Sequence, residues 1–165
     1  MSVQLRRIKA DAVIAIGSNL GDRAATFSAA VRTLAEADGI EVTAISTPIE
    51  TVAVRPEGAD ADAPAYLNAV VLVRTTLAPH ALLTLLHAIE NEYGRVREER
   101  WGDRTLDLDL IDYAGMQSST DDLTLPHPRA HERAFVLQPW AEVAPDAVLP
   151  GHGRVRDILA ALENR

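Results

Sequence analysis

The stretch that decides the fold is Thr105-Leu106-Asp107-Leu108-Asp109-Leu110-Ile111-Asp112-Tyr113. Apolar and acidic side chains alternate along it, and a period of two predicts a β-strand. The leucines then point to one face of a sheet, and Asp107 and Asp109 point together to the other face. Aspartate is a poor strand former, so two aspartates on one face indicate a use for the carboxylates.

The residues before and after this strand predict alternating strands and helices. Further strands are expected at 11–16, 40–54 and 66–75, with a short edge strand at 123–125, and Pro48 marks an edge or a bulge. Helices are expected at 24–37, 134–143 and 155–164. A further helix is expected to start at 76–79 and to run to about Tyr93. This order is the split βαβ pattern. We therefore expect one α/β (α+β) domain over residues 1–165, with a ferredoxin-like βαββαβ core, an antiparallel sheet, helices on the sheet and a helical C-terminal tail.

Composition sets the class of protein. The chain has 165 residues, of which 47% are hydrophobic and 24% charged, as in soluble globular proteins. None of the apolar runs approaches the roughly 20 residues of a membrane span, and residues 1–11 lack the apolar segment of a secretory signal. The net charge of −8 argues against a nucleic-acid partner. We expect a cytoplasmic protein that binds neither nucleic acid nor membranes.

Two residue counts exclude further classes of site. The chain has no cysteine, which excludes disulfides, cysteine-ligated zinc, iron–sulfur clusters and thiol nucleophiles. Lys9 is the single lysine, so the lysine of a P-loop is missing after the glycine turn at 17–22. That turn alone is a weak indication of a phosphate site.

Asp107 and Asp109 are candidate metal ligands. Two residues apart on one strand, they stand about 6–7 Å from each other at the backbone. Their repulsion is unfavourable unless a positive group lies between them, and Mg²⁺ binds one or two carboxylates together with substrate phosphates. Two alternatives stay open at this point, because the carboxylates could face water or pair with nearby arginines.

An arginine-rich segment precedes the acidic strand. Its arginines are Arg95, Arg97, Arg100 and Arg104. Guanidinium groups bind phosphate oxygens in bidentate geometry, and glycines at 94 and 102 would let the segment close over a substrate. A carboxylate pair beside such a segment favours phosphoryl transfer. The alternative is a solvated loop whose acidic residues balance the arginines.

Two further groups are candidates for ligand contacts. His127 lies between Pro126 and Pro128, which restrict its backbone and suit a fixed contact. Tyr66 and Asn68 share one face of a predicted strand, where a ring can stack and an amide can meet the edge of a heterocyclic base. A surface histidine and a ring packed on the sheet are the plain structural alternatives.

Four blocks of the chain resemble the 6-hydroxymethyl-7,8-dihydropterin pyrophosphokinase family, in family order and over nearly the whole length. They lie at 15–21, 66–69, 94–109 and 126–135. The third block, which combines the arginine segment with the acidic strand, is long and highly specific. The resemblance implies a ferredoxin-like fold and an enzyme of folate biosynthesis that transfers pyrophosphate from ATP to the pterin hydroxymethyl group and releases AMP.

The resemblance also implies residue roles. Asp107 and Asp109 would hold two Mg²⁺ ions, with ATP as co-substrate. Arg95 and Arg104 would be catalytic residues that meet the ATP phosphates, and Asp109 is a candidate to help deprotonate the alcohol. The ATP site would be completed by Glu90, Arg97, Leu110, Thr124, His127 and Arg133. The pterin would be bound by Thr47, Pro48, Tyr66, Asn68, Trp101 and Phe135, with the rings of Tyr66 and Phe135 on its two faces.

Departures from the family pattern concern affinity more than reaction type. The loop at 49–65 is longer than in compact members, His87 stands where some relatives have glutamine, and Pro128 stands where others have tyrosine. Two other functions stay open from the residues: a phosphohistidine relay with His127 or His131 as carrier, and a non-catalytic nucleotide- or pterin-binding module. We expect a monomer that acts on small molecules.

Overall fold

The fold is built on a five-stranded antiparallel sheet. The computed structural model describes residues 9–18, 23–51, 54–55, 58–59, 66–93 and 106–164. The strands of the sheet are β1 (Ala10–Ser18), β2 (Ile40–Ile45), β3 (Ile49–Thr51), β6 (Tyr66–Thr75) and β7 (Leu106–Tyr113). They are ordered β2-β6-β1-β7, with β3 also on β6, and every pair is antiparallel. The predicted antiparallel sheet is confirmed.

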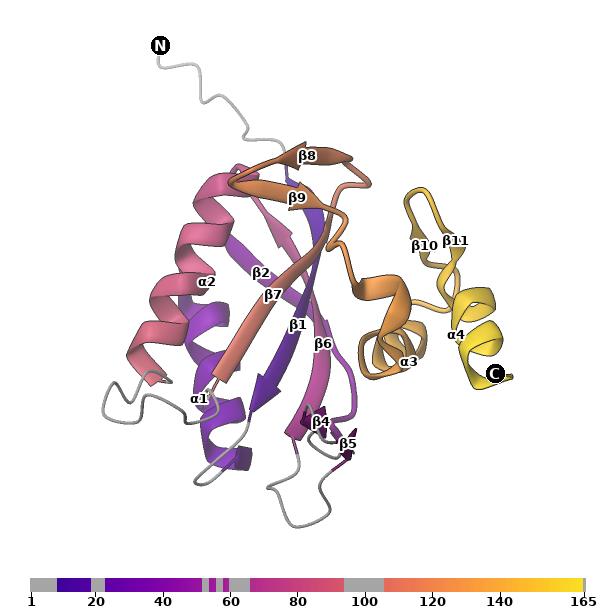
Figure 1. Cartoon of the computed structure of the whole chain (residues 1–165). Coiled ribbons are helices and arrows are strands. Elements are labelled where there is room, and N and C mark those ends of the chain that lie inside the picture. The colour runs from indigo at the N-terminus through magenta and orange to yellow at the C-terminus, as the bar shows by residue number, and fades with distance from the viewer. Residues whose placement is uncertain are drawn as a thin grey trace.

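Helices cover both faces of the sheet (Figure 1). The helices α1 (Arg23–Glu36) and α2 (Pro79–Tyr93) pack on one face. On the other face lies α3 (Ala134–Val143), after the short 3-10 turn η1 (Ala130–Glu132), and α4 (Val155–Glu163) packs against α3. The predicted α+β order and the helical C-terminal tail are therefore confirmed.

The sheet separates two apolar cores. On the side of α1 and α2, the core includes Ile14 and Leu108. On the side of α3 and α4, it includes Val13, Val70 and Trp140. Burial of apolar surface on both sides stabilises the sheet by roughly 25 cal/mol for each Å² removed from water. The central strands are accordingly apolar on both faces along most of their length.

The predicted alternation of β7 is confirmed from Leu106 to Leu110. Its leucines are buried toward α1 and α2, whereas Asp107 and Asp109 lie on the opposite face. The pairing of β7 with β1 then shifts register, and Ile111 enters the second core. A bulge of this kind adds one residue to a strand and so interrupts its period of two.

The strand predicted at 40–54 is wrong in its extent. It is broken into β2 and β3, which pair with β6 in succession. Between them, the Ser46 hydroxyl accepts a hydrogen bond from the Val70 N–H at 2.8 Å, and the Ser46 N–H donates to the Val70 carbonyl at 2.9 Å. Pro48 follows and has no N–H to offer the ladder.

Three short hairpins lie outside the main sheet. They pair β4 (Val54–Arg55) with β5 (Gly58–Ala59), β8 (Ser118–Thr120) with β9 (Leu123–Leu125), and β10 (Val148–Leu149) with β11 (Gly153–Arg154). The sequence predicts β9 alone among these six strands. Segments of two or three residues are too short for hydrophobic periodicity to reveal.

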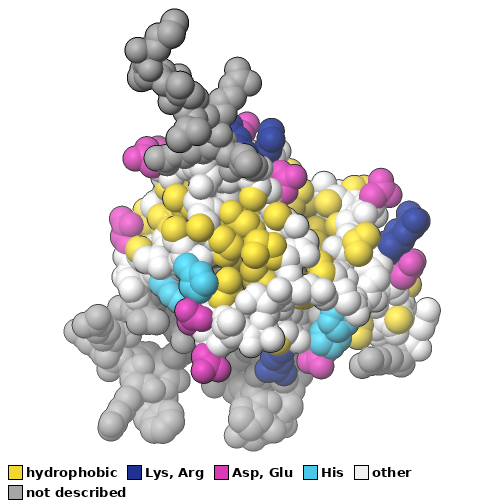
Figure 2. Space-filling model, turned by 90° about the horizontal axis from the view of Figure 1, so that it is seen from above, with side chains coloured by type: hydrophobic (Ala, Val, Ile, Leu, Met, Phe, Trp, Pro, Cys, Tyr) yellow, Lys and Arg dark blue, Asp and Glu magenta, His cyan; other side chains and the backbone are white. Residues whose placement is uncertain are grey.

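The end of the molecule opposite Asp107 and Asp109 is shown in Figure 2. Apolar side chains gather near its centre, with charged side chains and histidines around them. Among the described residues, no helix combines the length and the apolar character needed to cross a bilayer.

Candidate active site

A cavity of about 650 Å³ opens on the α3 face of the sheet. Its floor is β1, where Gly17 pairs with Asn68 of β6 on one side and with Asp107 of β7 on the other. A Cβ atom on Gly17 would lie 3.2 Å from the Asn68 Oδ1 and 4.0 Å from the Asp107 Cβ. Glycine at this position therefore leaves the floor open between an amide and a carboxylate.

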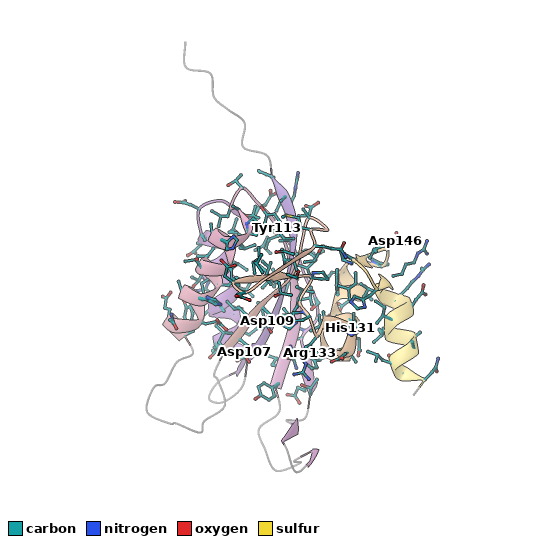
Figure 3. The ribbon with its side chains drawn as sticks, turned by 45° about the horizontal axis from the view of Figure 1, so that its top comes forward. Asp107, Asp109, Tyr113, His131, Arg133 and Asp146 are labelled. Carbon is teal, nitrogen blue, oxygen red and sulfur yellow. The ribbon has the colours of Figure 1, made fainter. Side chains whose placement is uncertain are left out.

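The acidic side of the cavity is β7. Asp107 and Asp109 both line it, as their shared strand face predicts, and Figure 3 shows them on the same strand with Arg133 nearby. The Arg133 Nη1 lies 3.8 Å from the Asp109 Oδ2. The Asp109 carboxylate is thus partly neutralised by Arg133.

A cationic and aromatic wall faces the acidic strand. Arg133 is the N-cap residue of α3, and Phe135 follows in the first turn of that helix. The Arg133 guanidinium carbon lies 5.6 Å from the centroid of the Phe135 ring, within the range of a cation–π interaction. Phe135 is 37% exposed although it is a large apolar residue, so its ring has a free surface for a flat ligand.

The remaining wall comes from β3 and β6. Tyr66 and Asn68 line the cavity together, which confirms that they share a strand face. Asn68 is 7% exposed, and its Nδ2 donates a hydrogen bond to the Thr51 Oγ1 at 2.7 Å. The amide is therefore held in one orientation by β3, with its oxygen toward Gly17.

The donor set of the cavity fits magnesium bound together with a phosphate ligand. Within the described ranges, no cluster of three or more His, Cys, Asp or Glu residues is arranged to hold a metal. Mg²⁺ does not require one, since it is bound by one or two carboxylates while phosphate oxygens and water fill its other positions. Asp107 and Asp109 offer those carboxylates on a single strand face.

His127 lies beside the acidic strand, and its backbone N–H donates a hydrogen bond to the Ile111 carbonyl at 2.9 Å. Its Nδ1 accepts a hydrogen bond from the Arg129 N–H at 3.2 Å, which identifies the tautomer with its proton on Nε2. Burial lowers the pKa of His127 below its ordinary value, against the opposing influence of Asp109, and Arg133 and Arg129 lower it further. The imidazole is therefore neutral at neutral pH, with an N–H available as a donor.

Four described residues expected at the ATP site do not line the cavity, and one of them is His127. Glu90 of α2 is 6% exposed and accepts a hydrogen bond from the Leu108 N–H at 3.1 Å. Leu110 is buried in the core beside α1 and α2, and Thr124 is exposed on β9. Of the five predicted ATP-site residues that the structure describes, Arg133 lies at the cavity wall.

Other predicted contacts lie in different places. Thr47 and Pro48 are outside the cavity lining, and Thr47 is hydrogen-bonded to Glu142 of α3. The remaining predicted positions lie outside the described residues: Arg95, Arg97, Trp101 and Arg104.

Sequence reasoning missed some lining residues. Thr51 and Arg129 line the cavity, as do the small residues Ala15 and Ala69. Arg129 lies two positions after His127, which is the one signal that could have identified it. Thr51 carries no such signal, because its place depends on the break between β2 and β3.

The cavity therefore combines two carboxylates, cationic groups, two aromatic rings and a fixed amide. A model of the 7,8-dihydro-6-hydroxymethylpterin-pyrophosphokinase (HPPK) family matches residues 13–145. The chain belongs to the HPPK family. It is therefore an ATP-dependent pyrophosphokinase, as the resemblance of its sequence blocks predicts, and the non-catalytic alternative is wrong.

Known HPPK proteins resemble the chain over most of its length. It is 47% identical over 152 residues to the 2-amino-4-hydroxy-6-hydroxymethyldihydropteridine pyrophosphokinase of Methylorubrum extorquens, an alignment that covers 92% of this chain and 93% of that one. It is 45% identical over 132 residues to the protein of the same name from Bacillus subtilis, with coverages of 80% and 77%.

Solved structures share the HPPK fold. The HPPK-DHPS A437G protein of Plasmodium falciparum superimposes with a TM-score of 0.73 at 12% identity, over 98% of this chain and 47% of that one. This chain thus spans about half the length of that protein. The likeness shows the fold and agrees with the predicted α+β class.

Proposed function

We propose that this HPPK transfers the pyrophosphoryl group of ATP to the hydroxymethyl group of 6-hydroxymethyl-7,8-dihydropterin and releases AMP. The observation that carries the proposal is one cavity lined by both Asp107 and Asp109 and by the rings of Tyr66 and Phe135. The carboxylates suit a magnesium-bound triphosphate, and the rings suit a flat heterocycle. The names of the relatives from M. extorquens and B. subtilis support the same pterin substrate and pyrophosphate transfer.

The proposed reaction needs no protein nucleophile, because the attacking group is the substrate alcohol. Its oxygen forms a bond to the β-phosphorus of ATP while the bond between that phosphorus and the oxygen bridging to the α-phosphorus breaks. AMP leaves with that oxygen, and the alcohol loses its proton. Asp109 remains the candidate to accept this proton.

Alignment and charge are the contributions of the protein. Two Mg²⁺ ions held by Asp107 and Asp109 would neutralise phosphate oxygens. Arg133 places a third positive centre beside the same carboxylates, with its Nη1 at 3.8 Å from Asp109. Arg95 and Arg104, which precede the acidic strand in the sequence, are proposed to meet the phosphates as charge develops on the leaving oxygen.

The pterin is proposed to lie between the rings of Tyr66 and Phe135. Asn68 would bond its edge through Oδ1, because one of the two N–H groups of Nδ2 is already bonded to Thr51, which fixes the amide orientation. Such an amide accepts one hydrogen bond from an N–H of the ring system and so favours one orientation of the heterocycle. The hydroxymethyl group then points toward the phosphates.

The experiment that tests the proposal is incubation of the protein with ATP, Mg²⁺ and the hydroxymethyl-dihydropterin, with separation of the nucleotides. We expect AMP and the pyrophosphorylated pterin in equal amounts. Formation of ADP together with an acid-labile phosphoprotein would favour the histidine relay instead. For that relay, His131 is poorly placed, because its ring stacks on His152 with centroids 4.2 Å apart and lies outside the cavity lining.

We propose that the enzyme acts as a cytoplasmic monomer. Light scattering during size-exclusion chromatography tests the oligomeric state, and a mass of twice the chain would contradict it. Cell fractionation tests the location.

A further inference from the structure

A single carboxylate joins two walls of the site. Glu142 in the last turn of α3 accepts hydrogen bonds from the Thr47 N–H, at 3.1 Å to Oε1 and 3.2 Å to Oε2. It also accepts one from the Thr47 hydroxyl at 2.7 Å. Thr47 belongs to the turn at 46–48 between β2 and β3, 95 residues before Glu142 in the chain.

Glu142 lies on the same helix as a wall of the cavity. Phe135 and Glu142 are seven residues apart, which is two turns and about 10 Å along one face of a helix. The helix is fixed to the sheet between them by Leu137 and Trp140, which are 0% and 2% exposed. The ring and the carboxylate therefore belong to one helix, α3, whose ribbon lies against a face of the sheet in Figure 1.

The turn that Glu142 binds leads into the opposite wall. Ser46 fastens the turn to β6 through its two bonds with Val70. Three residues beyond Pro48, Thr51 lines the cavity and orients Asn68. The turn is thus held by β6 on one side and by α3 on the other.

We infer that Glu142 is a positioning residue for the pterin: it holds the 46–48 turn against α3 and thereby sets the width of the cavity between Phe135 and Thr51. The inference rests on the proposed function. It concerns the pterin side of the cavity, because Glu142 binds Thr47 in the segment that leads to Thr51, and Thr51 orients Asn68.

The test is steady-state kinetics of Glu142→Ala with each substrate varied in turn. Loss of a hydrogen-bonded ionic group is expected to raise the KM for the pterin about tenfold, while the KM for ATP stays within about twofold of the wild type. A merely structural role would lower the amount of active enzyme, and so kcat, without moving either KM. Direct binding of the pterin with a non-hydrolysable ATP analogue should weaken by the same factor.

Two variants serve as controls. Glu142→Gln keeps an oxygen that can accept both bonds made at Oε1, so its KM for the pterin should stay within about twofold of the wild type. Gln138→Ala removes an exposed polar side chain from the same helix and should change neither KM. If Glu142→Ala does not fold, Glu142→Asp draws the carboxylate back by one methylene and should raise the same KM.

Unchanged pterin KM in Glu142→Ala, an equal rise in both KM values, or failure of glutamine to rescue would overturn the inference while leaving the proposed function intact. Absence of AMP formation by the wild-type protein would instead refute the proposed function itself.

Discussion

At the scale of single residues, the acidic pair on β7 has the largest consequence for chemistry. Asp107 and Asp109 lie on the face of β7 that turns toward α3. Further along the strand, this face carries the buried apolar residue Ile111. Two carboxylates on one face repel each other, and the Arg133 Nη1 lies 3.8 Å from the Asp109 Oδ2. Cations bound between the carboxylates and the phosphates of a ligand would offset this repulsion.

Replacing either aspartate should therefore remove catalysis rather than folding. We expect Asp107→Ala and Asp109→Ala each to lose about 2–4 kcal/mol of transition-state stabilisation, the range for single electrostatic groups in active sites. The measurement is kcat/KM for AMP formation, with the exposed Asp121→Ala as control. Full activity in either variant would refute the metal assignment.

Asp112, on the same strand, predicts a pH dependence of stability. Burial raises the pKa of Asp112 above its ordinary value of 3.8, although hydrogen bonds from the backbone of Gly115 and Tyr113 oppose the shift. Its Oδ1 is buried without a hydrogen-bond partner among the described residues. The folded state therefore favours the protonated form. The contribution of Asp112 to stability is fully present below about pH 3.8 and is lost as the pH rises through the raised pKa.

Urea unfolding of the wild type and of Asp112→Ala checks this sign. The difference in unfolding free energy between them should favour the wild type most at pH 3.5 and move toward the variant by pH 7, on the order of 1 kcal/mol for each unit of pKa shift. A difference that stays constant over this range would contradict the assignment.

At the scale of elements, α2 and β7 are joined by a hydrogen bond from strand to helix. β7 is an edge strand of the sheet, and the Leu108 N–H donates to the buried Glu90 carboxylate at 3.1 Å. This bond satisfies a backbone donor between the two aspartates, so it also fixes the strand that carries them.

Removing that acceptor should destabilise the protein. Glu90→Ala leaves the Leu108 N–H unsatisfied, and we expect a loss of about 1–3 kcal/mol in the free energy of unfolding. Glu90→Gln keeps an acceptor oxygen and should lose less. Chemical denaturation measures both variants, and equal stability of Glu90→Ala and the wild type would show that the bond contributes nothing.

At the scale of the whole molecule, the site depends on elements far apart in the chain. β1, β3, β6, β7 and α3 each contribute lining residues, and Figure 3 shows the aspartates and Arg133 arriving from different elements. A ligand that bridges these elements binds the folded state alone and therefore stabilises it.

Ligand binding should accordingly raise the melting temperature. With a non-hydrolysable ATP analogue at about 100 times its Kd and excess Mg²⁺, we expect roughly 2.7 kcal/mol of stabilisation, which is a shift of several degrees. EDTA should abolish the shift, and so should Asp107→Ala. A shift that persisted in EDTA would show that the nucleotide binds without the metal.

The elements whose side chains repeat with a clear period could be predicted from the sequence. The alternation of β7 and the helical spacing in 134–143 and 155–164 each correspond to an element with one apolar face, and these predictions are confirmed. The break at Ser46 could not be predicted, because it depends on bonds to Val70, 24 residues away. For the same reason Thr51 was missed at the cavity wall, whereas Tyr66, Asn68 and Phe135, which the sequence places at a predicted pterin site, do line the cavity.

The sequence by itself determined the order of strands and helices, the shared face of Asp107 and Asp109, and membership of the HPPK family, because these depend on local spacing and on contiguous blocks of residues. Only the tertiary structure decided that Glu90 of α2 accepts the Leu108 N–H and that Glu142 of α3 holds Thr47. Such contacts join segments that are distant in the chain, and their partners are chosen by how the two faces of the sheet are covered rather than by any local pattern.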